Sequence, residues 1–142
     1  MSLSAEEDKG SNALAAAINQ KLQENAENKL RAFLNRSWVR RDGTWADGLR
    51  ITVHFSNGNN FATVDEDLEY FARDDIKWRE IQFVDANTFR FEDLAKSEFA
   101  SSYSEAIGRI NFEENKIEVS VTTAGEVDDF LGSNQILVPF VE

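Results

Sequence analysis

The spacing of apolar residues changes abruptly near Asn35, and this change constrains the fold more than any other feature of the sequence. From Leu14 onward, apolar residues recur at every fourth position, which predicts an amphipathic helix. After Asn35 they recur at every second position, which is the period of a half-buried strand. We therefore expect a helix at 12–35, a β-domain at 36–142 and a disordered lead-in at 1–11.

The helix is expected to bury its apolar stripe against the β-domain, on the wall of a barrel or across one end. The stripe consists of Leu14, Ile18, Leu22, Ala26 and Leu30, followed by Phe33 and Leu34. The remaining positions are mostly polar or alanine, as a solvated surface requires. A surface for a partner or for a second copy of the chain is the alternative interpretation of the stripe.

Turn-forming residues divide the region after Asn35 into successive hairpins. Strands are predicted at 49–55, 61–64, 76–84, 88–92, 103–112, 116–123 and 135–141. The parity of the apolar positions slips between Trp78 and Ile81, which predicts a β-bulge, and Pro139 favours an edge position or a bulge. The segment 66–73 is expected to form a short helix or a lid-like loop.

These spacings predict a mostly β fold, an antiparallel up-and-down barrel of about eight strands preceded by the helix. A β-sandwich and a cystatin-like helix on a curved sheet are the alternatives. With 142 residues, 42% of them apolar, the chain is long enough for a single domain, 12–142, with its own core.

The charge is unevenly distributed, with a net −11 overall, +2 over residues 1–41 and −13 over 42–142. An acidic β-domain repels phosphates, which argues against nucleic acid as a partner. The basic residues around the end of the helix are expected to pair with the domain's own carboxylates. They are Arg31, Arg36, Arg40 and Arg41.

The residues that common catalytic and metal sites require are missing or isolated. The chain has no Cys, which excludes disulfides, thiolate nucleophiles and iron–sulfur clusters. His54 is the only histidine and falls on the polar side of its strand, so no Ser-His-Asp triad is predicted. The acidic run from Asp65 fails as a calcium loop, because Tyr70 and Ile76 stand where Gly and Glu are needed. We expect no enzyme, no metal and no cofactor.

Aromatic residues are the most informative candidates for a binding site. Most of them fall in or beside predicted strands, where they would fill a barrel. A ligand cavity uses the same residue types around a few polar groups, so the sequence leaves a filled and a hollow barrel open. The residues expected to contact a ligand are Trp38, Trp45, Phe61, Trp78 and Tyr103. Trp and Tyr add an N–H or O–H that can orient a ligand, whereas Phe61 offers only its ring.

The order of helix, early Trp and hairpins resembles the lipocalin and calycin group, in particular the small lipocalin-like domains of bacterial envelope lipoproteins. The residues that carry the resemblance are Asn35-Arg36-Ser37-Trp38, the Gly43-Thr44-Trp45 turn and the closing strand through Phe140. Arg36 stands where the family's Gly-x-Trp signature has Gly. The resemblance implies a barrel with one open end and no catalytic machinery.

We therefore expect a non-catalytic binding module that carries a small apolar ligand inside the barrel. One alternative is a structural or protein-interaction domain of the cell envelope, with a filled barrel and a contact surface on the acidic face or an edge strand at 135–141. The other is a carboxylate-dependent glycoside hydrolase. No apolar run reaches the about 20 residues that span a bilayer. The polar stretch after Met1-Ser2-Leu3 is typical of a chain whose leader was removed, which favours a periplasmic or envelope location.

Overall fold

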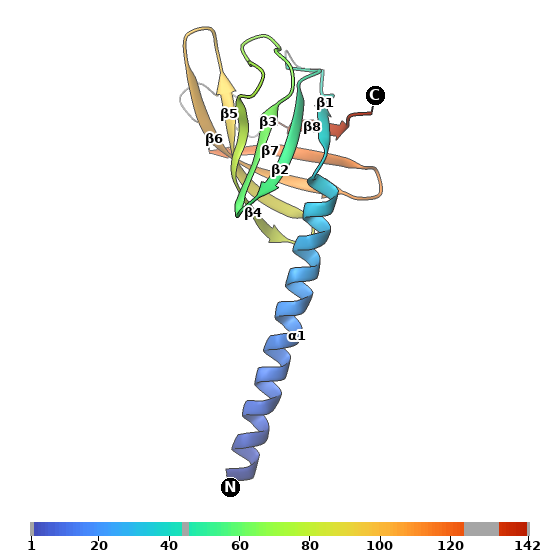
Figure 1. The fold of residues 1–142 in the computed structure, drawn as a ribbon, viewed down its shortest axis with the longest axis vertical. Coiled ribbons are helices and arrows are strands. Elements are labelled where there is room, and N and C mark those ends of the chain that lie inside the picture. The colour runs from blue at the N-terminus through green and yellow to red at the C-terminus, as the bar shows by residue number, and fades with distance from the viewer. Residues whose placement is uncertain (1, 44–45, 124–133, 142) are drawn as a thin grey trace.

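The chain folds into one long helix followed by strands that close into a barrel (Figure 1). The computed structural model describes residues 2–43, 46–123 and 134–141, with side chains from residue 12 onward. The elements are α1 (Ser2–Leu34), β1 (Ser37–Arg40), β2 (Arg50–Ser56), β3 (Asn59–Val64), β4 (Ile76–Asp85), β5 (Thr88–Lys96), β6 (Ser101–Asn111), β7 (Lys116–Thr123) and β8 (Asn134–Pro139). The strands pair in chain order and β8 pairs with β1, which confirms the predicted up-and-down antiparallel barrel.

The turns of the structure lie between the predicted strands. Asn57 and Gly58, with φ of 51° and 80°, form the two-residue connection between β2 and β3. Positive φ at both central residues is typical of a type I′ turn, which explains the Asn-Gly pair at this place. Between β4 and β5, the backbone N–H of Asn87 donates to Asp85 Oδ1 over 3.0 Å.

The bulge predicted between Trp78 and Ile81 is confirmed. The pairing of β4 with β5 shifts in register between Arg79 and Gln82, and Glu80 has a φ of 54°. The extra residue bends β4 and re-aims the side chains on either side of it.

The prediction of an edge strand at 135–141 is wrong, because β8 has a neighbouring strand on each side. It pairs with β7 through Val119–Gln135 and with β1 through Val39–Val138, so both of its edges are occupied. Pro139 is the last residue of β8, and the ladder continues past it because the N–H of residue 140 donates to Ser37 O over 3.0 Å. A proline is tolerated there because only the end of the strand lacks a donor.

The segment 66–73 forms a loop and not a helix. Leu68 and Phe71 exchange two backbone hydrogen bonds of 2.9 and 2.8 Å, which close a tight turn. Glu69 inside this turn has a φ of 50°. The turn directs Phe71 into the barrel, where it is 3% exposed.

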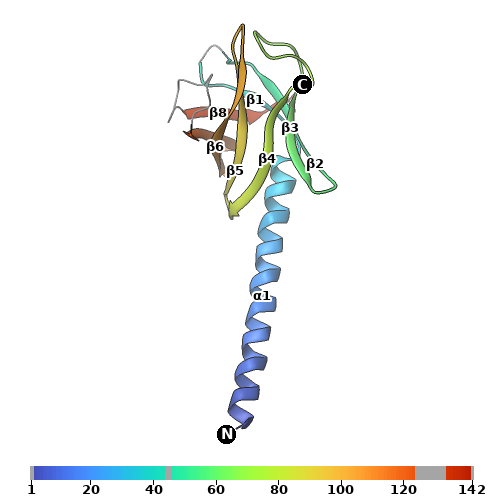
Figure 2. The same cartoon turned by 90° about the vertical axis from the view of Figure 1, so that its left-hand side faces the viewer.

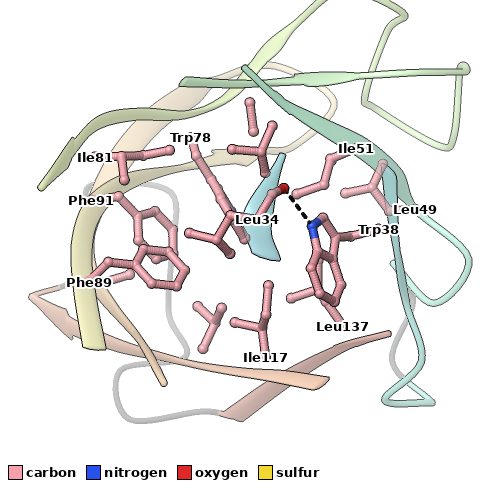
Figure 3. Packing of buried hydrophobic residues seen from close by; sticks show 14 of the residues in the cluster. Leu34, Trp38, Leu49, Ile51, Trp78, Ile81, Phe89, Phe91, Ile117 and Leu137 are labelled. Carbon is pink, nitrogen blue, oxygen red and sulfur yellow. Dashed lines mark hydrogen bonds between the residues drawn. The ribbon is translucent and has the colours of Figure 1, made fainter. Parts of the chain in front are cut away.

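The core begins where α1 ends, at what we call the helix end of the barrel. Leu30 and Leu34 are fully buried, and Figure 3 shows Leu34 near the centre of the ring of strands. Trp38 Nε1 donates to the carbonyl of Leu34 over 3.0 Å, which joins β1 to the last turn of α1. The ring of Phe33 lies 5.2 Å from that of Trp38 and 4.9 Å from that of Phe112.

Aromatic rings from β4 and β5 fill the space beside Leu34 (Figure 3). Trp78 lies 4.5 Å from Phe91 and 5.7 Å from Phe89, and the two phenylalanines lie 5.3 Å apart. Gly108 on β6 makes room for them, because a Cβ at that position would stand 2.3 Å from the Phe89 ring. The described interior is therefore packed at this level of the barrel.

Helix α1 projects from the barrel, which corrects the prediction that its whole stripe is buried (Figures 1 and 2). Leu14, Ile18 and Leu22 are 63%, 51% and 61% exposed. Two features of helix geometry explain the difference. A helix advances about 1.5 Å per residue, so Leu22 lies about 18 Å along the axis from Leu34. Each step of four residues also turns about 40° further around the axis, which places Leu14 and Leu34 about 160° apart.

The predicted helix from residue 12 is confirmed, and α1 is drawn from Ser2 to Leu34. The disordered lead-in at 1–11 stays a prediction.

The contrast between the buried and exposed leucines of α1 predicts opposite mutational effects. Leu30→Ala should lower the free energy of unfolding by about 2–5 kcal/mol, because it opens a cavity in the core. Leu22→Ala should change it by no more than about 0.5 kcal/mol, because the side chain lies mainly in water. Urea unfolding followed by tryptophan emission measures both, and a shifted midpoint for Leu22→Ala in the monomer would contradict the projecting helix.

Candidate functional site

The predicted ligand-binding residues do not gather around one cavity. Trp38 and Trp78 are 0% and 1% exposed and belong to the packed core. Phe61 and Tyr103 are half-buried on the outer wall of the barrel. Trp45 lies outside the described residues. A ligand could not contact the two tryptophans and the two outer rings at the same time.

Of the two outer rings, Phe61 lines a groove of about 480 Å³ between β3 and β4, and Tyr103 contacts two residues of its lining, Ile76 and Arg79. The groove is lined by Gly58, Asn59, Asn60, Phe61, Ile76, Arg79, Glu80, Ile81 and Gln82. It opens because the register of β3 with β4 extends only to Ala62–Trp78, and beyond this pair Asn60 Nδ2 donates to Ile81 O over 3.2 Å. The bulge in β4 thus separates two neighbouring strands on the outer wall.

Tyr103 holds Arg79 at the side of this groove. The guanidinium carbon of Arg79 lies 3.5 Å from the centre of the Tyr103 ring, and its Nη2 pairs with Glu92 over 3.2 Å. The phenol of Tyr103 donates to Ile76 O over 2.8 Å. Burial raises the pKa of Tyr103, and the hydrogen bond to Glu92 raises that of Arg79, so both groups keep their protons at neutral pH.

A buried ion pair lies at the opposite end of the barrel from α1, which we call the far end. The strands alternate in direction, so the beginning of β4, the end of β5 and the beginning of β8 meet there. Lys77 Nζ lies 2.7 Å from Asp93 Oδ1, with side chains 4% and 3% exposed. Lys77 also donates to Leu94 O over 2.6 Å, and Gln135 Nε2 donates to Asp93 Oδ2 over 3.3 Å.

Each charge of this pair is held by hydrogen bonds to another strand: Lys77 donates to Asp93 and to the carbonyl of Leu94 on β5, and Asp93 also accepts from Gln135 on β8. The Phe71 ring covers Lys77 at 4.9 Å from Nζ. Burying two charges costs several kcal/mol per ion, which good geometry only offsets. The hydrogen bonds of this pair therefore cross-link β4, β5 and β8.

The alternation of residues along β5 contains a signal for this pair. Asp93 continues the inward alternation of Phe89 and Phe91, so its carboxylate had to enter the barrel. A buried carboxylate requires a partner, and Lys77 supplies it. Gln135 likewise shares the inward parity of Leu137.

Asp75 stabilises the loop that precedes β4 at the far end of the barrel. Its Oδ2 accepts from Lys96 Nζ over 2.8 Å and from the backbone N–H of Ala72 over 2.9 Å. Burial by itself raises the pKa of Asp75, but these two hydrogen bonds together with the charge of Lys96 outweigh it, so the pKa lies below the ordinary value of 3.8.

The basic residues around the end of α1 behave largely as predicted. Arg31 pairs with Glu27 at 3.5 Å, Arg40 with Asp42 at 2.6 Å and Arg41 with Asp47 at 3.8 Å. Arg36 instead lies over the Trp38 ring, 5.8 Å from its centre.

The remaining candidate is the projecting part of α1. We call Leu14, Ile18 and Leu22 the outer stripe; they fall within about 80° of the helix circumference. Every described side chain from residue 12 to residue 25 is exposed, so no described part of the same chain covers the outer stripe. Gln20, on the opposite side of the helix, is polar.

Within 2–43, 46–123 and 134–141, no group of three or more His, Asp or Glu side chains could hold a metal ion. In the same residues, no helix combines the length and apolar character needed to traverse a bilayer.

No protein-family model, curated protein or solved structure matches the chain. The lipocalin resemblance therefore stays a prediction from the sequence.

The buried pair predicts a strong non-additivity between its two members. Lys77→Met should lower the free energy of unfolding by about 3–5 kcal/mol, because it leaves the Asp93 carboxylate buried without its cation. Adding Asp93→Leu should restore most of this loss, because no unpaired charge is then buried. The matched control is Arg79→Met with Glu92→Leu, an exposed pair on the same two strands, where each change should cost no more than about 1 kcal/mol. Additive losses at 77 and 93 would contradict the cross-link.

The Asp75 contacts predict a stability contribution that depends on pH. A carboxylate whose pKa is lowered by folding stabilises the protein above its unfolded pKa, and this contribution is lost as the pH falls through the folded pKa. Asp75→Asn should therefore reduce the free energy of unfolding by up to about 1 kcal/mol at pH 7 and by less near pH 3. Urea midpoints at both pH values measure the difference, with Asp74→Asn as the neighbouring control. An equal effect at both pH values would contradict it.

Proposed function

We propose that the domain is a non-catalytic protein-interaction module, in which the barrel is the scaffold and α1 is the interaction element. The observation that carries the proposal is the outer stripe, three large apolar side chains more than half exposed on a helix that leaves the barrel. Single exposed apolar residues are common, but a contiguous row of them on one helix face is typical of a binding surface.

The packing of the barrel supports the scaffold role. Leu30 and Leu34 fill the helix end, and Trp78 with its neighbouring rings fills the level beside them. The buried Lys77–Asp93 pair ties the far end. A scaffold of this kind holds the last turn of α1 in one orientation, because the Trp38 indole and the carbonyl of Leu34 are hydrogen-bonded inside the core.

Two other functions predict different measurements on the purified chain. A carrier of small apolar ligands predicts a saturable change in tryptophan emission when a fluorescent fatty acid is added, since the indoles of Trp38 and Trp78 lie in the interior. A glycoside hydrolase predicts turnover of a glycoside panel that one Asp or Glu substitution abolishes. The interaction module predicts neither.

Site-specific photo-crosslinking tests the proposed function directly. With p-benzoylphenylalanine at position 18, illumination of cells that contain the full chain should give discrete crosslinked species. The same group at position 20 should give none, because residues two apart lie about 160° apart around a helix. Equal crosslinking from both positions, or none from position 18, would contradict the assignment of α1 as the interaction element.

A further inference from the structure

We infer that the outer stripe binds a second copy of this chain, with the two α1 helices antiparallel and Ile18 at the two-fold axis. The inference rests on the proposed function and names the partner for the same surface. It is argued from the symmetry of the stripe, the distribution of charge along α1 and the position of the barrel at one end of the helix.

The outer stripe is self-complementary in an antiparallel pair. Leu14 and Leu22 lie four residues on either side of Ile18, so a two-fold axis through Ile18 places Leu14 of one chain opposite Leu22 of the other. All three side chains are more than half exposed in the single chain, so pairing removes apolar surface from water on both copies. No apolar residue of the stripe is left without a counterpart.

The charges of α1 favour the antiparallel orientation. Residues 2–11 contain Glu6, Glu7, Asp8 and Lys9, a net charge of −2. Residues 25–34, which lie level with 2–11 across an axis at Ile18, contain Glu27, Lys29 and Arg31, a net charge of +1. An axis through Ile18 brings the acidic end of each helix beside the basic end of the other, whereas a parallel pair places like charges together.

The barrel also favours this orientation. Leu34 lies near the centre of the ring of strands, so the barrel surrounds the line along which α1 ends (Figure 3). Paired helices lie about 8–10 Å apart, a distance at which two barrels at the same end would collide. Each α1 projects from one end of its barrel (Figures 1 and 2), so in the antiparallel pair the two barrels stand at opposite ends of the paired helices.

Analytical ultracentrifugation of the full chain tests the association. The mass should rise reversibly from 16.1 kDa toward twice that value between about 1 µM and about 1 mM, a range that covers weak complexes. Ile18→Glu should remain monomeric throughout, because it places two carboxylates against each other at the axis. Gln20→Glu adds the same charge on the opposite face and should associate like the unsubstituted chain. Circular dichroism checks that both variants keep their helix content.

Cysteine crosslinking tests the orientation, and the chain has no cysteine of its own. An equimolar mixture of Leu14→Cys and Leu22→Cys chains should oxidise to the 14–22 heterodimer, because these positions face each other across the axis. Homodimers linked 14–14 would indicate a parallel pair and overturn the inference.

The outcomes separate this inference from the function on which it rests. A chain that stays monomeric at every concentration, while position 18 photo-crosslinks to a different protein, overturns self-pairing and leaves the interaction function standing. A monomeric chain with no crosslink from position 18 overturns both. Association that Gln20→Glu abolishes as fully as Ile18→Glu also overturns self-pairing through the outer stripe.

Discussion

The burial of the last turn of α1 inside the barrel is the contact on which the rest of the structure depends. Leu30 and Leu34 occupy the space that the strands enclose, and the carbonyl of Leu34, which has no acceptor role within the helix, receives the Trp38 indole N–H. The helix thereby supplies part of the core instead of covering its outside. Because only this last turn is enclosed, the rest of α1 extends into solvent.

The helix closes one end of the barrel, and the buried polar groups at the other end still require hydrogen-bond partners. The far end contains the polar residues of the interior, and they are satisfied through pairs between strands such as Lys77 and Asp93. Such a pair contributes little net stability compared with apolar packing, but it tolerates only one register of β4 against β5. The bulge at Glu80 lies on the same strand and opens the outer groove on the opposite side of that wall.

Much of the fold could be predicted from the sequence, because alternation and turn chemistry are local. Strand β2 reads directly from the inward Ile51 and Val53, and the β2–β3 turn from Asn57-Gly58. The prediction that Pro139 lies on an edge strand was wrong, because β8 pairs with β1, which lies far away in the chain. The prediction that the helix stripe is buried was wrong, because a spacing of four residues identifies a helix but not the direction in which that helix leaves the domain.

The candidate site was harder to predict, because a site depends on which residues meet and not on their types. Phe61 and Tyr103 have outward parity, which separates them from Trp38 and Trp78 once the inner face is known. The inward parity of Asp93 was present in the sequence, but its pairing with Lys77 required the bulge to be placed first.

The pairing of β1 with β8 has a consequence for how the chain folds. Each hairpin joins neighbours in sequence, but Val39 and Val138 are 99 residues apart, and their pairing must pay the entropy of closing that whole loop. Contacts of such long range slow folding, and the β2–β7 meander has two open edges until they form. The first strand also continues directly from the helix that fills the core. We therefore expect closure of the barrel and enclosure of Leu34 to occur together, late in folding.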